Sequence, residues 1–136
     1  MWFNLSHSKG QAYLAVSSYA EVGLDIEIPH IRSNYLELAM RFFHKNEIKA
    51  LEEMDIKNGQ LLFLKLWTIK EALVKESGEG IANKLASIDA LDFLRKPCGW
   101  MFGEQQFQLY HREKNNLVMS LVWRGLEEMK IVCVTN

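Results

Sequence analysis

The stretch QLLFLKLWTIKEALVKES, residues 60–77, decides the fold of this chain, because it is the longest run with helical character. Apolar side chains cover most of the circumference of the predicted helix, which indicates a buried, central element. Gly78 comes directly after it and is a typical left-handed terminator of a helix. Asn58 and Gly59 lie just before it and predict a turn.

The segments on either side of this helix predict a sheet and shorter helices. Period-2 alternation and β-branched content predict strands over residues 12–17, 22–28, 87–93, 106–111, 117–123 and 130–134, with the last three in an antiparallel meander. Two shorter helices are predicted, one ending at Phe43 after a cap at Ser33 or Asn34, and one over residues 47–54 capped by Asn46. The pattern is that of an α+β fold, an antiparallel sheet packed against a long central helix and shorter helices.

Chain length and net charge limit the classes of function that this chain can have. The chain has 136 residues and a formal net charge of −1, from 16 basic and 17 acidic side chains. This length is typical of one domain, and we expect residues 1–136 to form a single unit. The charge balance does not favour a nucleic-acid or membrane-surface partner. No secretory signal or transmembrane stretch is recognised, so we expect a cytoplasmic protein.

Asp25 and Glu27 are the first candidate site residues. They lie two residues apart on a predicted strand, so both carboxylates point to the same side and can converge on one hard cation. A strand with one solvated acidic face is an equally ordinary interpretation. Gly23 lies on the same face and lets a ligand or another backbone approach closely.

Glu71 and Lys75 form the second candidate. Four residues apart on a helix, they are neighbours on its surface, a spacing that is also common for exposed ion pairs. The setting favours a functional role, because a charged pair on an almost wholly apolar helix needs a reason to be there.

Residues 4–10, NLSHSKG, are the third candidate. Short polar donors, a histidine and a lysine in one turn can surround an anion, although an ordinary loop before a strand has the same composition.

Taken together and in order, these motifs resemble the larger class of 4′-phosphopantetheinyl transferases, the surfactin-synthetase-activating type, which is related to the holo-acyl-carrier-protein synthases. The matching segments are FNLSHS at 3–8, VGLDIE at 22–27, RFF at 41–43 with Glu47, LWTIKEALVK at 66–75 and GEG at 78–80. The resemblance covers residues 3–80. It implies a 4′-phosphopantetheinyl transferase-like fold, of which this chain is the C-terminal half of the usual pseudo-dimer.

The resemblance also implies residue roles. Asp25, Glu27 and Glu71 would bind Mg²⁺. Coenzyme A phosphates would be contacted by basic and hydroxyl side chains, namely Ser6, His7, Lys70 and Lys75, with the carrier protein as the alternative contact of Lys70.

The reaction implied is the transfer of 4′-phosphopantetheine from coenzyme A to a serine of an apo acyl or peptidyl carrier protein, with release of 3′,5′-ADP. Mg²⁺ suits an all-oxygen site completed by substrate phosphate. Phosphoryl transfer needs positioning and charge neutralisation. We therefore expect Glu71 to take the serine proton and Lys75 to offset phosphate charge.

Members of this class usually carry a second, similar half before the FNLSH segment. Self-association is our leading hypothesis for what replaces it; a separately encoded partner and a fragment or degenerate copy are the alternatives. The rival functions are a non-catalytic coenzyme A or carrier-protein binding subunit and a Mg²⁺-dependent phosphohydrolase.

Overall fold

The computed structural model describes residues 1–30, 32–114, 116–125 and 130–134, and for residues 79–80 the backbone only. Strands and helices follow one another within this part of the chain as β1 (Trp2–Ser8), β2 (Gln11–Ser17), β3 (Val22–Glu27), α1 (Tyr35–Phe42), α2 (Lys45–Glu52), α3 (Ile56–Ser77), α4 (Glu79–Ala82), the 3₁₀ turn η1 (Leu85–Ser87), α5 (Ala90–Arg95), β4 (Cys98–Phe102), β5 (Gln105–Lys114) and β6 (Leu117–Arg124). In the described residues, no helix is both long and apolar enough to span a bilayer.

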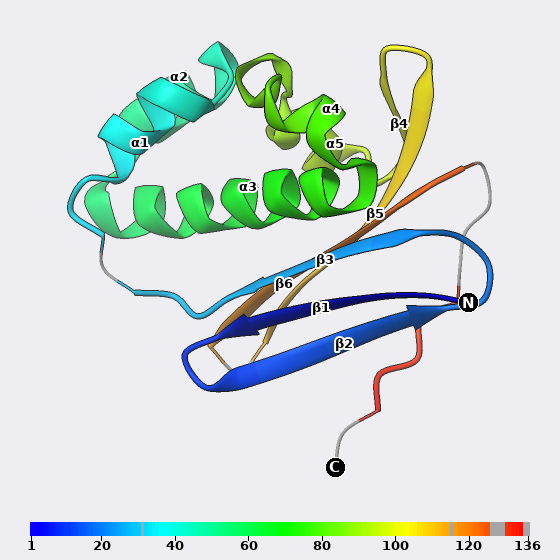
Figure 1. Cartoon of the computed structure of the whole chain (residues 1–136). Helices are drawn as coiled ribbons and strands as arrows, with labels where there is room; N and C mark the ends of the chain where they lie inside the picture. Colours follow the sequence, from blue (N-terminus) through cyan, green and yellow to red (C-terminus); the bar gives the residue numbers. More distant parts are fainter. Residues whose placement is uncertain (31, 115, 126–129, 135–136) are drawn as a thin grey trace.

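The strands form two antiparallel groups. One sheet has the strand order β3-β6-β5-β4, and β1 and β2 form a separate hairpin. Positive φ angles at Lys9 (44°) and Gly10 (82°) make the hairpin turn, as a tight two-residue turn requires. In Figure 1, α3 lies across one face of the sheet, the shorter helices lie on the far side of α3, and β1 runs beside β3. The predicted α+β architecture is therefore confirmed.

The core is built around α3. Leu66, Ile69, Ala72 and Leu73 of this helix are fully buried, which confirms its central position. Phe63 stacks on Phe43 with ring centroids 5.0 Å apart and on Trp67 at 5.8 Å. These aromatic contacts join α3 to the end of α1.

The start of α3 corrects the prediction of a turn at Asn58 and Gly59. The helix begins at Ile56, because Asp55 accepts a hydrogen bond from the Asn58 amide and caps the first turn. Gly59 lies inside the helix for a packing reason. A Cβ atom there would lie 2.6 Å from the hydroxyl of Tyr35, so only glycine leaves room for that ring.

The predicted cap of α2 is also wrong. The helix begins at Lys45, one residue before Asn46, and its cap is His44, whose Nδ1 accepts a hydrogen bond from the Asn46 amide at 3.1 Å. Glu47 completes a capping box, since its carboxylate accepts a hydrogen bond from the His44 amide at 2.7 Å.

Two predicted strands are absent from the described residues. Residues 87–93 instead enter α5, because the Asp89 side chain accepts a hydrogen bond from the Asp92 amide and caps a helix. Residues 130–134 form no strand, although their composition is strand-like. β6 already has β3 on one edge and β5 on the other, so the sheet has no place beside it for a further strand. β4, which the sequence analysis missed, pairs with the other side of β5.

Candidate active site

Strand β3 brings its acidic side chains against α3. Gly23, Asp25 and Glu27 share one face of the strand, because successive side chains alternate across a sheet. A Cβ atom on Gly23 would overlap the carbonyl oxygen of Ala72 and lie 2.6 Å from the Glu76 amide nitrogen. The missing side chain therefore lets the α3 backbone approach β3 directly, which places the next acidic residues of β3 beside the same stretch of helix.

Helix α3 contributes Glu71 and Lys75 to this contact. The Lys75 ammonium donates to the backbone carbonyl of Leu24 at 2.9 Å and to Asp25 Oδ1 at 3.1 Å. Lys75 thus joins the helix to the strand rather than pairing with Glu71 on a solvated surface. Its side chain remains 29% exposed, so it lies at the boundary between the protein interior and solvent.

The hairpin supports β3 from the other side. Asn4 Oδ1 accepts a hydrogen bond from the Leu24 amide at 2.9 Å, and Ser6 Oγ accepts one from the Ile26 amide at 3.1 Å. The Ser6 hydroxyl also donates to Asp25 Oδ1 at 3.4 Å. Residues 4–10 are consequently not a loop: the polar motif lies on β1, and only Lys9 and Gly10 form the turn.

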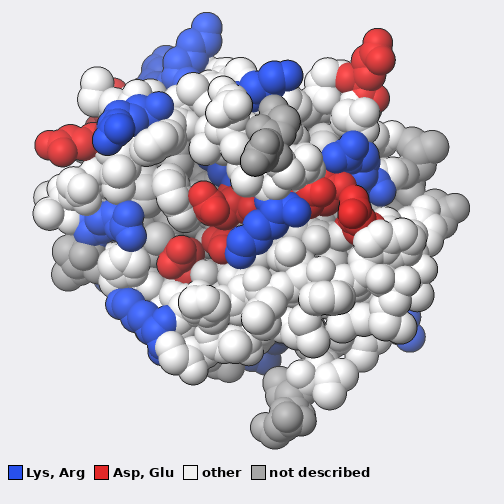
Figure 2. Space-filling model, in the orientation of Figure 1, with Lys and Arg blue, Asp and Glu red and all other residues white. Residues whose placement is uncertain are grey.

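The cluster places several acidic groups close together in a partly buried environment. Burial raises the pKa of Asp25 from its ordinary 3.8 to about 7; Lys75 opposes the rise, and the carboxylates of Glu27 and Glu71 add to it. Burial also raises the pKa of Glu71, again with Lys75 opposing and Glu27 adding. Asp25 and Glu71 therefore both lie in a buried, negatively charged environment to which Glu27 contributes. In Figure 2, acidic side chains gather across the middle of this face around a basic one, where Figure 1 has α3 facing β3.

These residues suit a divalent cation. Asp25 Oδ2 is buried and has no hydrogen-bond partner in the described part of the chain, and an unpaired carboxylate oxygen of this kind is a ready cation ligand. In the same part of the chain, no group of three or more His, Cys, Asp or Glu side chains is arranged so that it could hold a metal ion by itself. Mg²⁺ is usually bound by only one or two carboxylates together with substrate phosphates and water, so Asp25 with one neighbouring carboxylate would be enough protein ligands for it.

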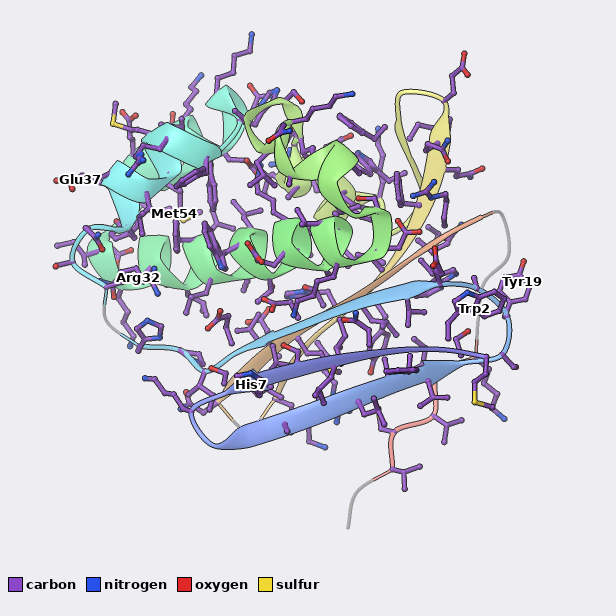
Figure 3. All side chains as sticks on the ribbon, viewed as in Figure 1. Trp2, His7, Tyr19, Arg32, Glu37 and Met54 are labelled. Carbon is purple, nitrogen blue, oxygen red and sulfur yellow. The ribbon has the colours of Figure 1, made fainter. Side chains whose placement is uncertain are left out.

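Two of the predicted coenzyme A contacts lie elsewhere. Ser6 is only 3% exposed and faces β3 and Asp25, so its position does not support a direct contact with a phosphate. His7 is exposed on the opposite face of β1, and Figure 3 shows it at the end of the strand next to the hairpin turn. The structure therefore separates two neighbours that were expected to act together, and the role of His7 stays a prediction.

The predicted phosphate contact of Lys70 stays a prediction that its position does not support, because its side chain is 2% exposed and points into the protein. Its ammonium lies 2.7 Å from Glu47 Oε1 and donates to the carbonyls of Leu85 and Ile88, each at 2.7 Å. It also lies 5.0 Å from the ring centre of Phe43, a cation–π contact. In this structure Lys70 therefore joins helices inside the fold.

Glu47 is the buried partner that the sequence analysis matched to a motif without giving it a role. Besides Lys70, its carboxylate accepts hydrogen bonds from the His44 amide at 2.7 Å and the Ala90 amide at 3.0 Å. Its capping-box position, three residues after His44, was a signal that could have revealed it. Asn4 was likewise missed as a support of β3, and no sequence rule indicates that role.

A groove on the other side of β3 is separate from the acidic cluster. It has a volume of about 920 Å³ and lies between the hairpin and the sheet face that carries Val22 and Leu24, with residues 130–134 along one side. Asp25 faces the other side of β3, so we assign the chemistry to the acidic cluster and not to this groove.

Comparison with known proteins agrees with this geometry. A sequence model of the 4′-phosphopantetheinyl transferase superfamily matches residues 21–122, which include β3 and all of α3. A protein of Synechocystis sp., named provisionally as a 4′-phosphopantetheinyl transferase, is 30% identical over 131 residues, 90% of this chain and 53% of that protein.

Two further relatives match over shorter segments. The 4′-phosphopantetheinyl transferase HetI of Nostoc sp. is 40% identical over 87 residues, 64% of this chain and 36% of HetI. The 4′-phosphopantetheinyl transferase AcpT of Escherichia coli is 38% identical over 90 residues, 66% of this chain and 46% of AcpT.

The fold, the acidic site between β3 and α3 and these similarities lead to one assignment: the chain belongs to the 4′-phosphopantetheinyl transferase superfamily. It spans about half the length, or less, of these curated relatives.

Proposed function

We propose that this chain is the catalytic half of an enzyme that transfers 4′-phosphopantetheine from coenzyme A to a serine of an apo carrier protein. The observation that carries the proposal is the buried carboxyl of Asp25, which is coupled to Glu27 and Glu71 and has one oxygen without a partner in the described residues. Such a cluster needs a cation, and it lies in the segment that matches the family.

Asp25, Glu27 and Glu71 would hold Mg²⁺. When bound, the ion would neutralise charge on the pyrophosphate of coenzyme A. Lys75 would bind a phosphate oxygen as well: an ammonium has three N–H donors, and two of them are used by Leu24 and Asp25. His7, exposed at the end of β1, would offset phosphate charge farther out.

Glu71 is the base in this proposal. Its raised pKa brings it closer to neutrality, where a carboxylate accepts a proton more readily. The serine oxygen forms a bond to the phosphorus that carries the pantetheine arm, the bond from that phosphorus to 3′,5′-ADP breaks, and Glu71 takes the serine proton. The nucleotide leaves with the electrons of the broken bond.

The direct test is intact mass spectrometry of several apo carrier proteins incubated with this chain, coenzyme A and Mg²⁺. We expect at least one of them to gain the mass of one phosphopantetheine group, and EDTA to prevent the gain. Binding of coenzyme A without any transfer would contradict the proposal and favour a non-catalytic binding subunit. Release of 3′,5′-ADP without a carrier protein would favour a phosphohydrolase.

We also propose that a second copy of the chain completes the site, as the usual pseudo-dimer does with two similar halves. The outer face of the hairpin carries the exposed cross-strand pairs Phe3–Val16 and Leu5–Leu14, an apolar surface typical of an interface. His7 lies on this same face of β1, so a copy seated there would border the coenzyme A site.

Sedimentation measures this association. We expect a dimer or larger species for the wild-type chain and a shift towards monomer for Leu5→Glu, because a charge would be buried in the interface. Lys57→Glu, at an exposed position near the start of α3, is the control. A wild-type chain that is monomeric and still active would contradict the association.

A further inference from the structure

The contact between β1 and β3 is made by side chains where a sheet would use its backbone. β1 lies beside β3, yet the two strands belong to different sheets. The amides of Leu24 and Ile26 donate instead to Asn4 Oδ1 and Ser6 Oγ, at 2.9 and 3.1 Å. β3 is an edge strand, so these side chains satisfy donors that an edge would otherwise present to solvent.

The same contact occurs twice along the two strands, because the polar side chains of β1 and the amides of β3 have the same spacing. Asn4 and Ser6 are two residues apart on β1, and Leu24 and Ile26 are two residues apart on β3. Because side chains and outward amides both recur with period 2 along a strand, each polar side chain meets one amide. The two contacts therefore fix the lateral position and register of β3 relative to the hairpin.

Ser6 has a second contact that reaches the acidic cluster. While its oxygen accepts from Ile26, its hydroxyl donates to Asp25 Oδ1, the same oxygen that receives Lys75. Two donors on Oδ1 fix the rotation of the carboxyl group. The other oxygen, Oδ2, then remains buried without a partner in the described residues, where a cation can bind it.

We propose that Asn4 and Ser6 are positioning residues, which hold β3 and orient Asp25 for a divalent cation without contacting coenzyme A. The inference rests on the proposed role of Asp25 as a metal ligand. It gives the polar motif of β1 two functions on its two faces: the buried face supports the metal site, and the exposed face carries His7.

Mn²⁺ affinity, measured by electron paramagnetic resonance without coenzyme A, tests the orienting role. We expect Ser6→Ala to weaken Mn²⁺ binding about 10-fold or more, as loss of a group behind a metal ligand commonly does. Asn4→Ala should change it only a few-fold, because Asn4 does not touch Asp25. Ser6→Thr, which keeps the hydroxyl, should restore much of the affinity, and Ser8→Ala, on the same face of β1, is the matched control.

Amide hydrogen exchange tests the supporting role without any metal. We expect faster exchange of the Leu24 amide in Asn4→Ala and of the Ile26 amide in Ser6→Ala, with neither changed in Ser8→Ala. Unchanged exchange in both variants would overturn the supporting role, even if the chain binds no Mn²⁺ and the proposed function fails. Wild-type Mn²⁺ affinity in Ser6→Ala, together with a raised KM for coenzyme A, would overturn the orienting role and return Ser6 to the substrate site.

Discussion

Lys70 and Glu71 are consecutive on α3, yet they lie in two different charged regions, one buried and internally paired and the other partly exposed. Lys70 lies in a closed one, in which Glu47 and two backbone carbonyls receive its ammonium inside the fold. Glu71 lies in an open one, in which Lys75 is the one cation that acts on both Asp25 and Glu71 among the contacts described above, and Glu27 adds a third carboxyl group. The closed region neutralises its own charge, whereas in the open region the carboxyl groups outnumber the cation that acts on them.

The difference shows how one helix can serve structure and chemistry together. Burial raises the pKa of Glu47 and lowers that of Lys70, and the attraction between the two opposes both shifts. Such a pair is satisfied without a ligand. At Asp25 the same burial acts on a carboxyl surrounded by like charges, and one of its oxygens has no partner among the described residues.

The largest expected effect is a loss of stability when the buried Lys70–Glu47 pair is broken. Lys70→Ala leaves Glu47 as a buried, unpaired acid, and we expect the free energy of unfolding to fall by about 3–5 kcal/mol. Urea denaturation measures this. The double variant Lys70→Met with Glu47→Leu should recover part of the loss, because no buried charge remains. A loss below about 1 kcal/mol, with weakened coenzyme A binding, would instead place Lys70 in the open region.

The second expected effect is a pH dependence that arises in the open region. The folded-state pKa of Asp25 is raised, so the folded protein binds more protons than the unfolded chain between pH 4 and 7. Stability from this group is complete below pH 4 and is lost as the pH rises through about 7, by about 4 kcal/mol at most.

The measurement compares urea unfolding of the wild type and Asp25→Asn in EDTA at pH 5 and pH 8. The variant cannot titrate at this position, so its stability should fall less between the two pH values. Mg²⁺ should restore stability to the wild type at pH 8 and have little effect on the variant. Equal pH dependence in both proteins would show that Asp25 titrates normally.

The third expected effect is on catalysis. Glu71→Gln removes a cation ligand and the proposed base, and we expect transfer to fall at least about 100-fold, or about 3 kcal/mol in the barrier. The free energy of unfolding should change by less than about 1 kcal/mol, because Glu71 is only half buried. Glu113→Gln is the matched control, an acid outside the cluster that pairs with Lys65. Near-normal transfer by Glu71→Gln would remove the base assignment.

Local patterns in the sequence predicted the central helix, β3, and the acid pair on one face of β3, because these depend on periodicity. The role of Gly23 as a point of close approach was also predictable in part, although only the structure identifies the approaching group as the α3 backbone. The family resemblance supplied the link between β3 and Glu71, which no local pattern contains.

Other features depend on contacts between distant segments and could not be predicted. Lys70 and Glu71 look alike in a charged helical motif, and only the position of Glu47 on α2 determines which of them points inward. Residues 130–134 have the composition of a strand, but both edges of β6 are already paired. The resemblance made Ser6 a coenzyme A contact, and no local pattern could show its hydrogen bond to an amide of β3 that is twenty residues away.

The central claim is that Asp25, Glu27 and Glu71 bind one divalent cation between β3 and α3. Titration with Mn²⁺, followed by electron paramagnetic resonance in the presence of coenzyme A, tests it most directly. We predict one ion for each chain, with the affinity lowered about 10-fold or more in Asp25→Asn and in Glu71→Gln and unchanged in Glu113→Gln. Equal Mn²⁺ affinity in the wild type and in both cluster variants would contradict the claim.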